Sequence, residues 1–584
     1  MLKKTKIICT MGPSTEKAGI LENMMEAGMN VARFNFSHGN HQEHAERIKY
    51  VRATAAKTGK TIALLLDTKG PEMRLGMFAE GKVKLVEGQT FVLTSEEVRG
   101  TTERAMVNHS MLPQEVSPGN QILLADGLVC LNVEAVKGND IITTVLNSGE
   151  IGDRKRVAAP GVSLNLPFLS DKDVLDIQFG IEQNMDFIAA SFVQRAADVL
   201  AIRKVLENAK AQMDIIAKIE NAEGVKNIDE ILKVADGIMV ARGDLGVEIP
   251  AEDVPVVQKR IIEKCNKAGK PVITATQMLE SMINNPRPTR AEASDIANAI
   301  MDGSDCIMLS GETAQGKYPV EAVETMARIA LRIEAALNYS SILLAKGIVP
   351  QRTTTDAISH ATVQIGHELG AAAIITSTQF GHTARMVSKY RPSANIVAVT
   401  PFEKTMRRIM LLWGVIPVLG VTSENSDEMV NNAVQYALAA GAVNDGDLVV
   451  LTAGVPAGMT GTTNMIRVHI VGNILLRGTG IGQKAVTGRI CIATSINDVQ
   501  NKLQPGDILV VHSVDEETAP YASKAAAIVA VEGGLTSQAA IVGISYGIPV
   551  IVGVDGATDR LHDGSTVTVD AGRGLVFQGE INAR

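Results

Sequence analysis

Residues 215–221 read IIAKIEN, an apolar run that is interrupted by Lys218 and Glu220. Because side chains alternate across a strand, both charges share a face with Ile216, and the opposite face is wholly apolar. Charged side chains are seldom buried without a partner or a metal ion. A cation and an anion two residues apart at the end of a buried strand therefore indicate either a structural ion pair or a functional site.

Seven further runs of this kind lie between residues 5 and 340, and stretches with helical periodicity fall between them. The eight runs are TKIICTMGPS (5–14), MNVARFNFSH (29–38), TIALLLDTKG (61–70), MDFIAASFVQ (185–194), DIIAKIEN (214–221), DGIMVARGD (236–244), KPVITATQ (270–277) and DCIMLSGET (305–313). Eight strand–helix units predict an α/β fold, a closed (β/α)8 TIM barrel, with a doubly wound open sheet as the alternative. In a barrel the C-terminal ends of the strands carry the chemistry.

The rest of the chain divides into three further parts. Residues 71–167 show short β-like runs with turn signals, which predict an all-β domain inserted into a barrel loop. A lid over the barrel mouth is the functional interpretation, and a passive insertion is the alternative. Residues 341–473 show a second α/β pattern, with predicted strands AAAIITST (371–378), NIVAVTP (395–401) and DLVVLTAG (447–454). Residues 478–584 are rich in Gly and Val, so we expect two more domains. The barrel itself then takes residues 1–70 and 168–340.

Composition argues against several classes of function. The net charge of −8, with acids and bases interspersed, argues against a nucleic-acid or a polybasic membrane surface. The five cysteines are scattered and form no C-x-x-C pair, which favours reduced thiols over disulfides or a zinc site. No apolar segment approaches membrane-spanning length, and the N-terminus does not resemble a signal peptide. We expect a cytoplasmic protein with no nucleic-acid or membrane partner.

Polar residues, with one glycine among them, gather at the predicted C-terminal strand ends. They are Arg33, Asn35, Ser37, Asp67, Thr68, Lys218, Glu220, Gly243, Asp244 and Thr276. If the barrel closes, these groups converge on one mouth. Glu220 and Asp244 could then hold a hard divalent cation whose shell is completed by water and substrate oxygens, with Lys218 as a fixed positive charge beside it. A supporting Lys218–Glu220 ion pair is the alternative.

Longer segments around these residues closely resemble the motifs of the pyruvate kinase family. They are MNVARFNFSHG (29–39), LLLDTKGPEMR (64–74), IIAKIENAEG (215–224), MVARGDLGVE (239–248), ITATQMLESM (273–282) and PRPTRAEASDIANAIMDG (286–303). The resemblance extends from residue 1 to about residue 472. It implies transfer of the phosphoryl group of phosphoenolpyruvate to ADP, which gives ATP and, after protonation of the enol, pyruvate. Enzymes of this family need Mg²⁺ or Mn²⁺, and most also need K⁺.

The resemblance also implies a role for each strand-end residue. Glu220 and Asp244 would be the Mg²⁺ ligands, and Arg33 would contact the phosphoryl group. Lys218 would stabilise charge on the transferring phosphoryl group and on the enolate. This role would explain why a lysine lies in a buried strand. Thr276 would bind substrate and lie on the proton route to the enolate. Gly243 and Asp244 are expected just before a helix, and their backbone N–H groups would bind the substrate carboxylate.

Further positions are implied for K⁺ and for the nucleotide. The implied K⁺ ligands are Asn35, Ser37, Asp67 and Thr68, and Glu72 is the residue that accompanies K⁺ dependence in this family. The implied nucleotide contacts are Asn35, His38, Arg74 and Lys155. The segment around Lys155, RKRVAAPG (154–161), departs from the usual GVNLPG run, and a solvated basic face is the alternative there.

The segment ITSTQFGHTARMVSKYRP (375–392) resembles the loop with which this family grips a phosphorylated effector. The implied contacts are Thr378, Phe380, Gly381, His382 and Thr383, because an NH-rich turn suits phosphate. Gln379 stands where many relatives carry a lysine, so the sequence leaves the identity of the effector open, and a plain turn is the alternative. The family is usually tetrameric, and we expect a homotetramer.

The segment VEGGLTSQAAIVGISYGIPVIVG (531–553) resembles the swivelling phosphohistidine domain of phosphoenolpyruvate synthase and related enzymes. Their motif has histidine where this chain has Gln538. An amide is not a nucleophile, so a phosphohistidine relay is excluded here.

Two other functions remain open on the sequence. One is a different metal-dependent barrel enzyme, a mutase or an aldolase, in which Lys218 would form a Schiff base with an oxoacid. The other is a catalytically inactive sensor of phosphorylated metabolites. The intact set of Arg33, Lys218, Glu220, Asp244 and Thr276 argues against the sensor.

Overall fold

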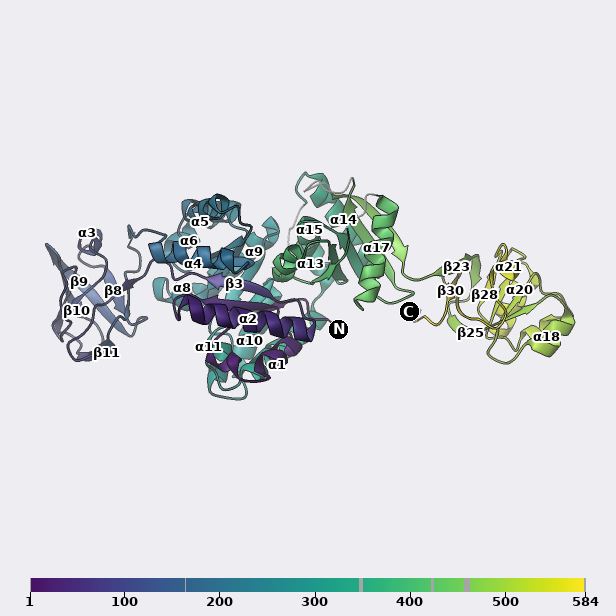
Figure 1. The fold of residues 1–584 in the computed structure, drawn as a ribbon, viewed down its shortest axis with the longest axis horizontal. Helices are drawn as coiled ribbons and strands as arrows, with labels where there is room; N and C mark the ends of the chain where they lie inside the picture. The colour runs from purple at the N-terminus through teal and green to yellow at the C-terminus, as the bar shows by residue number, and fades with distance from the viewer. Residues whose placement is uncertain (1, 163, 346–349, 422–424, 456–462, 582–584) are drawn as a thin grey trace. The chain divides into compact units, whose positions relative to one another are not determined.

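The computed structural model describes residues 2–162, 164–345, 350–421, 425–455 and 463–581 (Figure 1). The chain forms two compact units: Met1–Ala357 with Thr378–Leu419, and Ile358–Ser377 with Gly420–Arg584. Over the described residues, no helix combines the length and the apolar character that crossing a membrane requires.

A closed barrel of eight parallel strands forms the centre of the first unit, and each of the eight predicted runs supplies one strand. In order around the barrel they are β1 (Lys6–Thr10), β17 (Cys306–Leu309), β16 (Val272–Ala275), β15 (Gly237–Ala241), β14 (Asp214–Ile219), β13 (Phe187–Ala190), β3 (Ala63–Asp67) and β2 (Val31–Asn35). The predicted (β/α)8 barrel is confirmed, and the alternative of an open sheet is wrong.

Side-chain alternation along the strands divides the barrel core into two layers. Ile216 of β14 packs inside the barrel against residues such as Leu65 and Met239. Ile215 and Ile219 belong to the outer layer, between the strands and the helices. Lys218 and Glu220 share the face of Ile216, so the strand directs both charges along the inner wall toward the C-terminal mouth.

Helices cover the outside of the barrel, and α2 (His41–Thr58), α4 (Asp171–Glu182), α6 (Ala222–Lys226) and α10 (Arg290–Asp302) begin at residues whose side chains cap the helix. Helix α4 starts with reciprocal hydrogen bonds between Ser170 and Asp173. Helix α10 starts in the same way, from Thr289 and Glu292. The other helices around the strands are α1 (Ile20–Ala27), α5 (Ala196–Asn208), α7 (Ile228–Val234), α8 (Arg242–Glu248), α9 (Val254–Ala268), α11 (Gly311–Ala314) and α12 (Pro319–Ala336).

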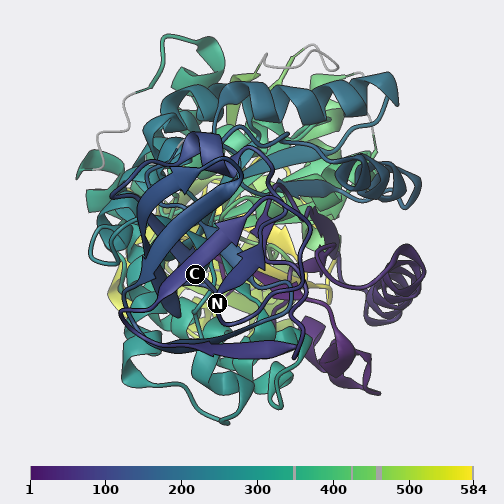
Figure 2. The ribbon, with the colours of Figure 1, turned by 90° about the vertical axis from the view of Figure 1, so that its left-hand side faces the viewer.

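The insertion between β3 and α4 is a separate β-domain with its own apolar core, in which Phe91 and Leu131 are buried. In Figure 2 its strands, drawn in dark blue, face the viewer. One sheet has the order β4 (Met73–Arg74), β12 (Arg156–Ala158), β8 (Gln121–Leu124), β9 (Val129–Lys137), β10 (Asp140–Val145), β6 (Thr90–Thr94) and β7 (Arg104–Met106), and a second pairs β11 (Gly149–Gly152) with β5 (Lys82–Leu85). A short helix, α3 (Leu112–Glu115), also occurs in this otherwise β segment.

The α/β segment that follows the barrel contributes to both units. In the first unit lie α13 (Tyr339–Ala345), α15 (His382–Lys389), α16 (Glu403–Arg408) and the parallel pair β19 (Asn395–Thr400) and β20 (Val415–Leu419). In the second, β21 (Leu448–Gly454) pairs in parallel with β18 (Ala373–Ser377) and antiparallel with β22 (Thr463–Ile470), beside α17 (Ser426–Ala439). The sequence pattern predicts β18, β19 and β21 but not β20, because Pro417 interrupts its apolar run.

The last part of the second unit is a mixed sheet of eight strands. Its order is β23 (Ile474–Arg477), β30 (Leu575–Gln578), β29 (Thr566–Asp570), β25 (Ala485–Ala493), β26 (Ile508–Val511), β27 (Ala527–Ala530), β28 (Val550–Val552) and β24 (Thr479–Ile481). Helix α20 (Gln538–Tyr546) connects β27 to β28, and Val542 on this helix packs into the core beside Ile528. The chain beyond the barrel thus forms α/β domains, as predicted.

Candidate active site

Lys218 lies at the centre of a buried charge cluster at the barrel mouth. Its Nζ is 2.9 Å from Glu220 Oε1 and 3.1 Å from Asp67 Oδ1, and it donates a 2.7 Å hydrogen bond to Ser191 Oγ. Lys218 is only 8% exposed. An ammonium group has three donors, so two carboxylates and one hydroxyl satisfy it completely. The Lys218–Glu220 ion pair therefore exists, but as part of a larger cluster.

Burial and neighbouring charges shift the pKa values of the groups in this cluster. Burial alone would lower the pKa of Lys218, but Asp67 and Glu220 raise it above its ordinary value, so the ammonium group is charged at neutral pH. Burial raises the pKa of Glu220 to about 7, and the charge of Asp244 adds to this rise while Lys218 opposes it. Glu220 and Asp244 therefore lie close enough to repel each other, and a divalent cation between them would relieve that repulsion.

Asp67, at the end of β3, is shared by two cations. Its Oδ2 accepts a 2.6 Å hydrogen bond from Arg33 Nε, and its Oδ1 faces Lys218. Burial would raise the pKa of Asp67, but Arg33 and Lys218 lower it below its usual range. Asp67 is thus a carboxylate that fixes the relative positions of Arg33 and Lys218.

Two hydroxyl groups complete this arrangement, and the sequence analysis missed both. Thr10, the last residue of β1, accepts a 2.9 Å hydrogen bond from Arg33 Nη1. Ser191 follows β13, and besides accepting from Lys218 it donates to the backbone carbonyl of Thr68 at 2.7 Å. Both residues are polar groups at C-terminal strand ends, so the signal that identified the other strand ends would have found them in the first and fourth runs.

Thr276 follows β16 in a strained conformation, with φ of 69°. Its hydroxyl donates to the carbonyl of Ala275 at 2.6 Å and accepts a 2.8 Å hydrogen bond from the Gly243 N–H. Gly243 and Asp244 lie within the first turn of α8 rather than before it. In this structure the Gly243 N–H thus points at Thr276, and a hydrogen bond links these two predicted substrate-binding residues.

The predicted ligands of the divalent cation fit Mg²⁺ by the chemistry of their donors. Over the described residues, no cluster of three or more His, Cys, Asp or Glu side chains is arranged to hold a metal ion. Mg²⁺ commonly binds through one or two carboxylates and takes its remaining oxygens from water and substrate phosphates. Glu220 and Asp244 suit that mode, and the Phe192 N–H, 2.6 Å from Glu220 Oε2, orients the first of them.

The predicted K⁺ ligands come from the ends of two paired strands. Asn35 of β2 and Asp67 of β3 are direct partners in the sheet. Asn35 Oδ1 accepts a 3.1 Å hydrogen bond from the Ser37 N–H, and Thr68 Oγ1 accepts one of 3.1 Å from the Ser191 N–H. All four side chains carry oxygen donors, which are the ligands that hard cations prefer, so the set fits K⁺.

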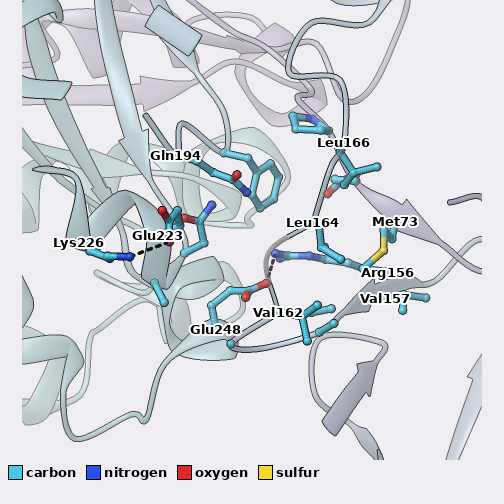
Figure 3. Close-up of a pocket in the computed structure, with 18 residues that line it drawn as sticks. Met73, Arg156, Val157, Val162, Leu164, Leu166, Gln194, Glu223, Lys226 and Glu248 are labelled. Carbon is cyan, nitrogen blue, oxygen red and sulfur yellow. Dashed lines mark ion pairs between the residues drawn. The ribbon is translucent and has the colours of Figure 1, made fainter. Parts of the chain in front are cut away.

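The inserted domain contacts the mouth through Arg156 of β12, which the sequence analysis did not single out. Its Nη1 is hydrogen-bonded to Asp244 Oδ1, and its Nη2 lies 3.9 Å from Glu248 Oε1. The guanidinium carbon is 4.9 Å from the centre of the Phe192 ring. Figure 3 shows Arg156 extending from its strand toward Glu248. This contact has no sequence signal, because Arg156 lies in the insertion and not at a barrel strand end.

A cavity of about 210 Å³ lies beside this contact. Its apolar wall comes from Met73, Val162, Leu164 and Leu166 of the inserted segment, and its polar wall from Gln194, Glu223, Lys226 and Glu248 of the barrel (Figure 3). The inserted domain therefore covers part of the mouth in this structure, as a lid would.

The predicted nucleotide contacts are less closely grouped. Arg74 is held by Glu72, with 2.6 Å between Nη2 and Oε2, and its Nη1 donates to the carbonyl of Arg154 at 2.9 Å. His38 and Lys155 are exposed. The backbone carbonyl of Lys155 accepts from Leu75 within the inserted domain, and its neighbour Arg156 is the residue that reaches the mouth. The structure does not bring Lys155 together with the strand-end cluster.

The predicted effector loop is an ordered turn that opens α15. Thr378 Oγ1 accepts a 3.0 Å hydrogen bond from the Gly381 N–H. Gly381 has φ of 83°, and a Cβ there would lie 2.5 Å from Ile409, so glycine is required. Phe380 is exposed and stacks on Phe402, while His382 and Thr383 form the first turn of the helix. This geometry fits both an effector loop and a plain turn.

In the C-terminal domain, Gln538 is the first residue of α20. Ser537 caps this helix by accepting a 3.3 Å hydrogen bond from the Ala540 N–H. The loop therefore keeps an intact helix start with an amide side chain at the position of the expected nucleophile.

Comparisons with known proteins agree along the whole chain. The family model "Pyruvate kinase, barrel domain" matches residues 2–323, "Pyruvate kinase, alpha/beta domain" matches residues 356–469, and "PEP-utilising enzyme, mobile domain" matches residues 503–574. A pyruvate kinase from Geobacillus stearothermophilus is 54% identical over 582 residues, and one from Bacillus licheniformis is 53% identical over 581; both alignments cover 99% of either chain. A crystal structure of a pyruvate kinase from Cryptosporidium parvum superposes with a TM-score of 0.77 at 42% identity, covering 80% of this chain and 96% of the other.

Proposed function

Because this chain belongs to the pyruvate kinase family, we propose that it transfers the phosphoryl group of phosphoenolpyruvate to ADP, giving ATP and pyruvate in the last step of glycolysis. The observation that carries this proposal is the charge cluster at the mouth. There a charged Lys218 lies beside Glu220, with Arg33 held next to it by Asp67. Phosphoryl transfer depends mainly on positioning and electrostatic stabilisation, and such a cluster provides both.

Each residue at the mouth then has a defined task. Arg33 binds the phosphoryl group, and Lys218 stabilises the negative charge that develops on this group and on the enolate as the transfer proceeds. Mg²⁺ or Mn²⁺, held by Glu220 and Asp244, would neutralise charge on the substrate oxygens. Thr276 binds substrate and conducts a proton to the enolate, and its hydrogen bonds to Ala275 and Gly243 hold its hydroxyl in place.

The finer assignments follow the same family relationship. K⁺ binds at Asn35, Ser37, Asp67 and Thr68, and ADP binds along Asn35, His38, Arg74 and Lys155. A phosphorylated metabolite binds at Thr378, Phe380, Gly381, His382 and Thr383 and regulates the enzyme. The protein acts as a cytoplasmic homotetramer. The proposed contact between Lys155 and ADP requires a further movement of the inserted domain. In this structure the Lys155 side chain is exposed and lies apart from the cluster.

A coupled assay of phosphoenolpyruvate and ADP, with and without Mg²⁺ and K⁺, tests the proposal. We expect pyruvate formation that requires both ions. Turnover without any divalent cation would contradict the metal assignment, and equal rates in K⁺ and in a bulky organic cation would contradict the K⁺ assignment. Borohydride treatment in the presence of an oxoacid should leave Lys218 unmodified, whereas trapping would favour a Schiff-base enzyme.

A further inference from the structure

Arg156 joins the inserted domain to the barrel mouth, and the proposed reaction gives it no task. Its backbone belongs to the sheet of the inserted domain, where it pairs with Arg74 of β4. Its carbonyl accepts a 2.9 Å hydrogen bond from the Ala125 N–H. Since this backbone is fixed, the guanidinium group leaves the mouth only by a change of rotamer or by movement of the whole inserted domain.

The guanidinium group lies among acidic and aromatic side chains of the barrel. It is hydrogen-bonded to Asp244 and covers the ring of Phe192. It also faces Glu248 (Figure 3). Arg156 is 9% exposed, so water screens these interactions weakly. A planar guanidinium group suits such a site, because it can pair with carboxylates and stack on a ring at the same time.

This contact involves both carboxylates that are proposed to bind the divalent cation. Asp244 is the direct partner of Arg156. Phe192, which lies under the guanidinium group, donates its N–H to Glu220 Oε2 at 2.6 Å. A carboxylate that is paired with a guanidinium group offers fewer free lone pairs to a metal ion, and the two cations repel each other.

We propose that Arg156 is a positioning residue that latches the inserted domain over the mouth and competes with the divalent cation for Asp244. The inference rests on the proposed role of Asp244 as a metal ligand. In latched molecules Asp244 is paired with the guanidinium group, and only the remaining molecules bind the cation at full affinity. The apparent affinity falls in proportion to that remaining fraction.

Electron paramagnetic resonance titration of Mn²⁺ into the full-length protein, without substrates, tests the latch. Arg156→Met should lower the dissociation constant of Mn²⁺ by roughly three- to tenfold, as expected if the latch is closed in most molecules. Arg154→Met removes the same charge from an exposed neighbour in the inserted domain and should change the constant by less than about twofold, because exposed charges are well screened. Arg156→Lys keeps the charge on a side chain without the planar fork, and its constant should lie between those of Arg156→Met and the wild type.

The outcomes separate the latch from the metal assignment. Asp244→Asn should weaken Mn²⁺ binding strongly; unchanged binding in this variant would overturn the metal assignment and with it the latch. If Asp244→Asn weakens binding while Arg156→Met equals the wild type, the metal assignment stands and the latch is wrong. Equal tightening in Arg156→Met and Arg154→Met would also overturn the latch, since it would indicate a general charge effect. If Arg156→Met does not fold, Arg156→Lys decides: wild-type affinity in that variant contradicts the latch.

Discussion

The two ends of the barrel both contain buried ion pairs, but they use them differently. At the end opposite the mouth, three aspartates at strand starts each pair with an arginine of the first unit. The pairs are Asp186–Arg407, Asp214–Arg408 and Asp305–Arg391. Asp186 and Asp305 also accept hydrogen bonds from the backbone N–H groups of Leu64 and Val272. All the partners of these two carboxylates thus belong to the fold itself.

At the mouth the partners are shared at close range, whereas at the opposite end the second partner of Asp214, Arg385, lies 4.0 Å away. Asp67 serves both Arg33 and Lys218, and Lys218 is in turn shared between Asp67 and Glu220. Such a cluster can exchange one partner for a substrate oxygen without leaving a charge uncompensated. Buried charge therefore indicates stability at one end of the barrel and chemistry at the other, and the close sharing of one carboxylate by two cations distinguishes the mouth.

Removing the central cation of the mouth should have the largest effect on turnover. Lys218→Met should lower the turnover number by at least about 10²–10³, because the charge is needed mainly as the phosphoryl group moves. Binding of phosphoenolpyruvate, measured by equilibrium titration, should stay near normal. An unchanged turnover number would refute the role assigned to Lys218.

A smaller effect is expected from a hydroxyl group that only the structure identifies. Ser191→Ala removes one hydrogen bond to the charged Lys218, and a bond to a charged group contributes about 1.5–3 kcal/mol, so turnover should fall at least about tenfold. Ser304→Ala is the matched control, because this buried hydroxyl bonds to Thr274 at 2.7 Å near the start of β17, away from the mouth. Equal turnover numbers in the two variants would contradict the proposal that the mouth, and not the opposite end of the barrel, carries the chemistry.

At the opposite end, breaking an ion pair should reduce stability and leave turnover nearly unchanged. Arg391→Met leaves Asp305 buried without its cation, which typically costs about 3–5 kcal/mol of folding free energy. Arg391 also lies 5.1 Å above the ring of Trp413, which is the single tryptophan of the chain. The fluorescence of Trp413 therefore reports unfolding in urea. Loss of turnover in the folded variant would show that this end also takes part in the chemistry.

The smallest effect on turnover is expected from removing the C-terminal domain. A chain that ends at Val471 should keep most of its turnover number, because Gln538 excludes a phosphohistidine step and the barrel already holds a complete site. It loses the packing of Ile470 against Leu575 and Phe577, so the temperature of unfolding should fall. Absence of turnover in the folded truncation, or acid-labile phosphate on the full-length protein after incubation with phosphoenolpyruvate, would contradict this view.

The barrel could be predicted from the sequence because each of its strands has a signal within a single segment. Each strand shows its own apolar run, and alternation within residues 215–221 already places Lys218 and Glu220 on one face. The sharing of Asp67 by Arg33 and Lys218 depends on how β2, β3 and β14 meet in the closed barrel, which no single run contains. The positive φ of Thr276 is likewise imposed by tertiary packing, because a β-branched residue does not prefer it.

The inserted domain marks the limit of that reasoning. Its strands follow from turn signals, but its contact with the mouth depends on the relative placement of two folded parts of one unit. Lys155 and Arg156 are adjacent and similarly charged, so the sequence alone gives no physical reason to prefer either. The structure does: Lys155 is exposed and Arg156 reaches Asp244.

The capped start of α20 has a consequence for how this domain can change over generations. A glutamine codon becomes a histidine codon through a single substitution at its third base. Ser537 caps the helix through its own hydroxyl, so an imidazole in place of the Gln538 amide requires no change of backbone. The domain therefore lies one point mutation away from a histidine at this position, and natural variation at this codon would show whether selection retains the glutamine.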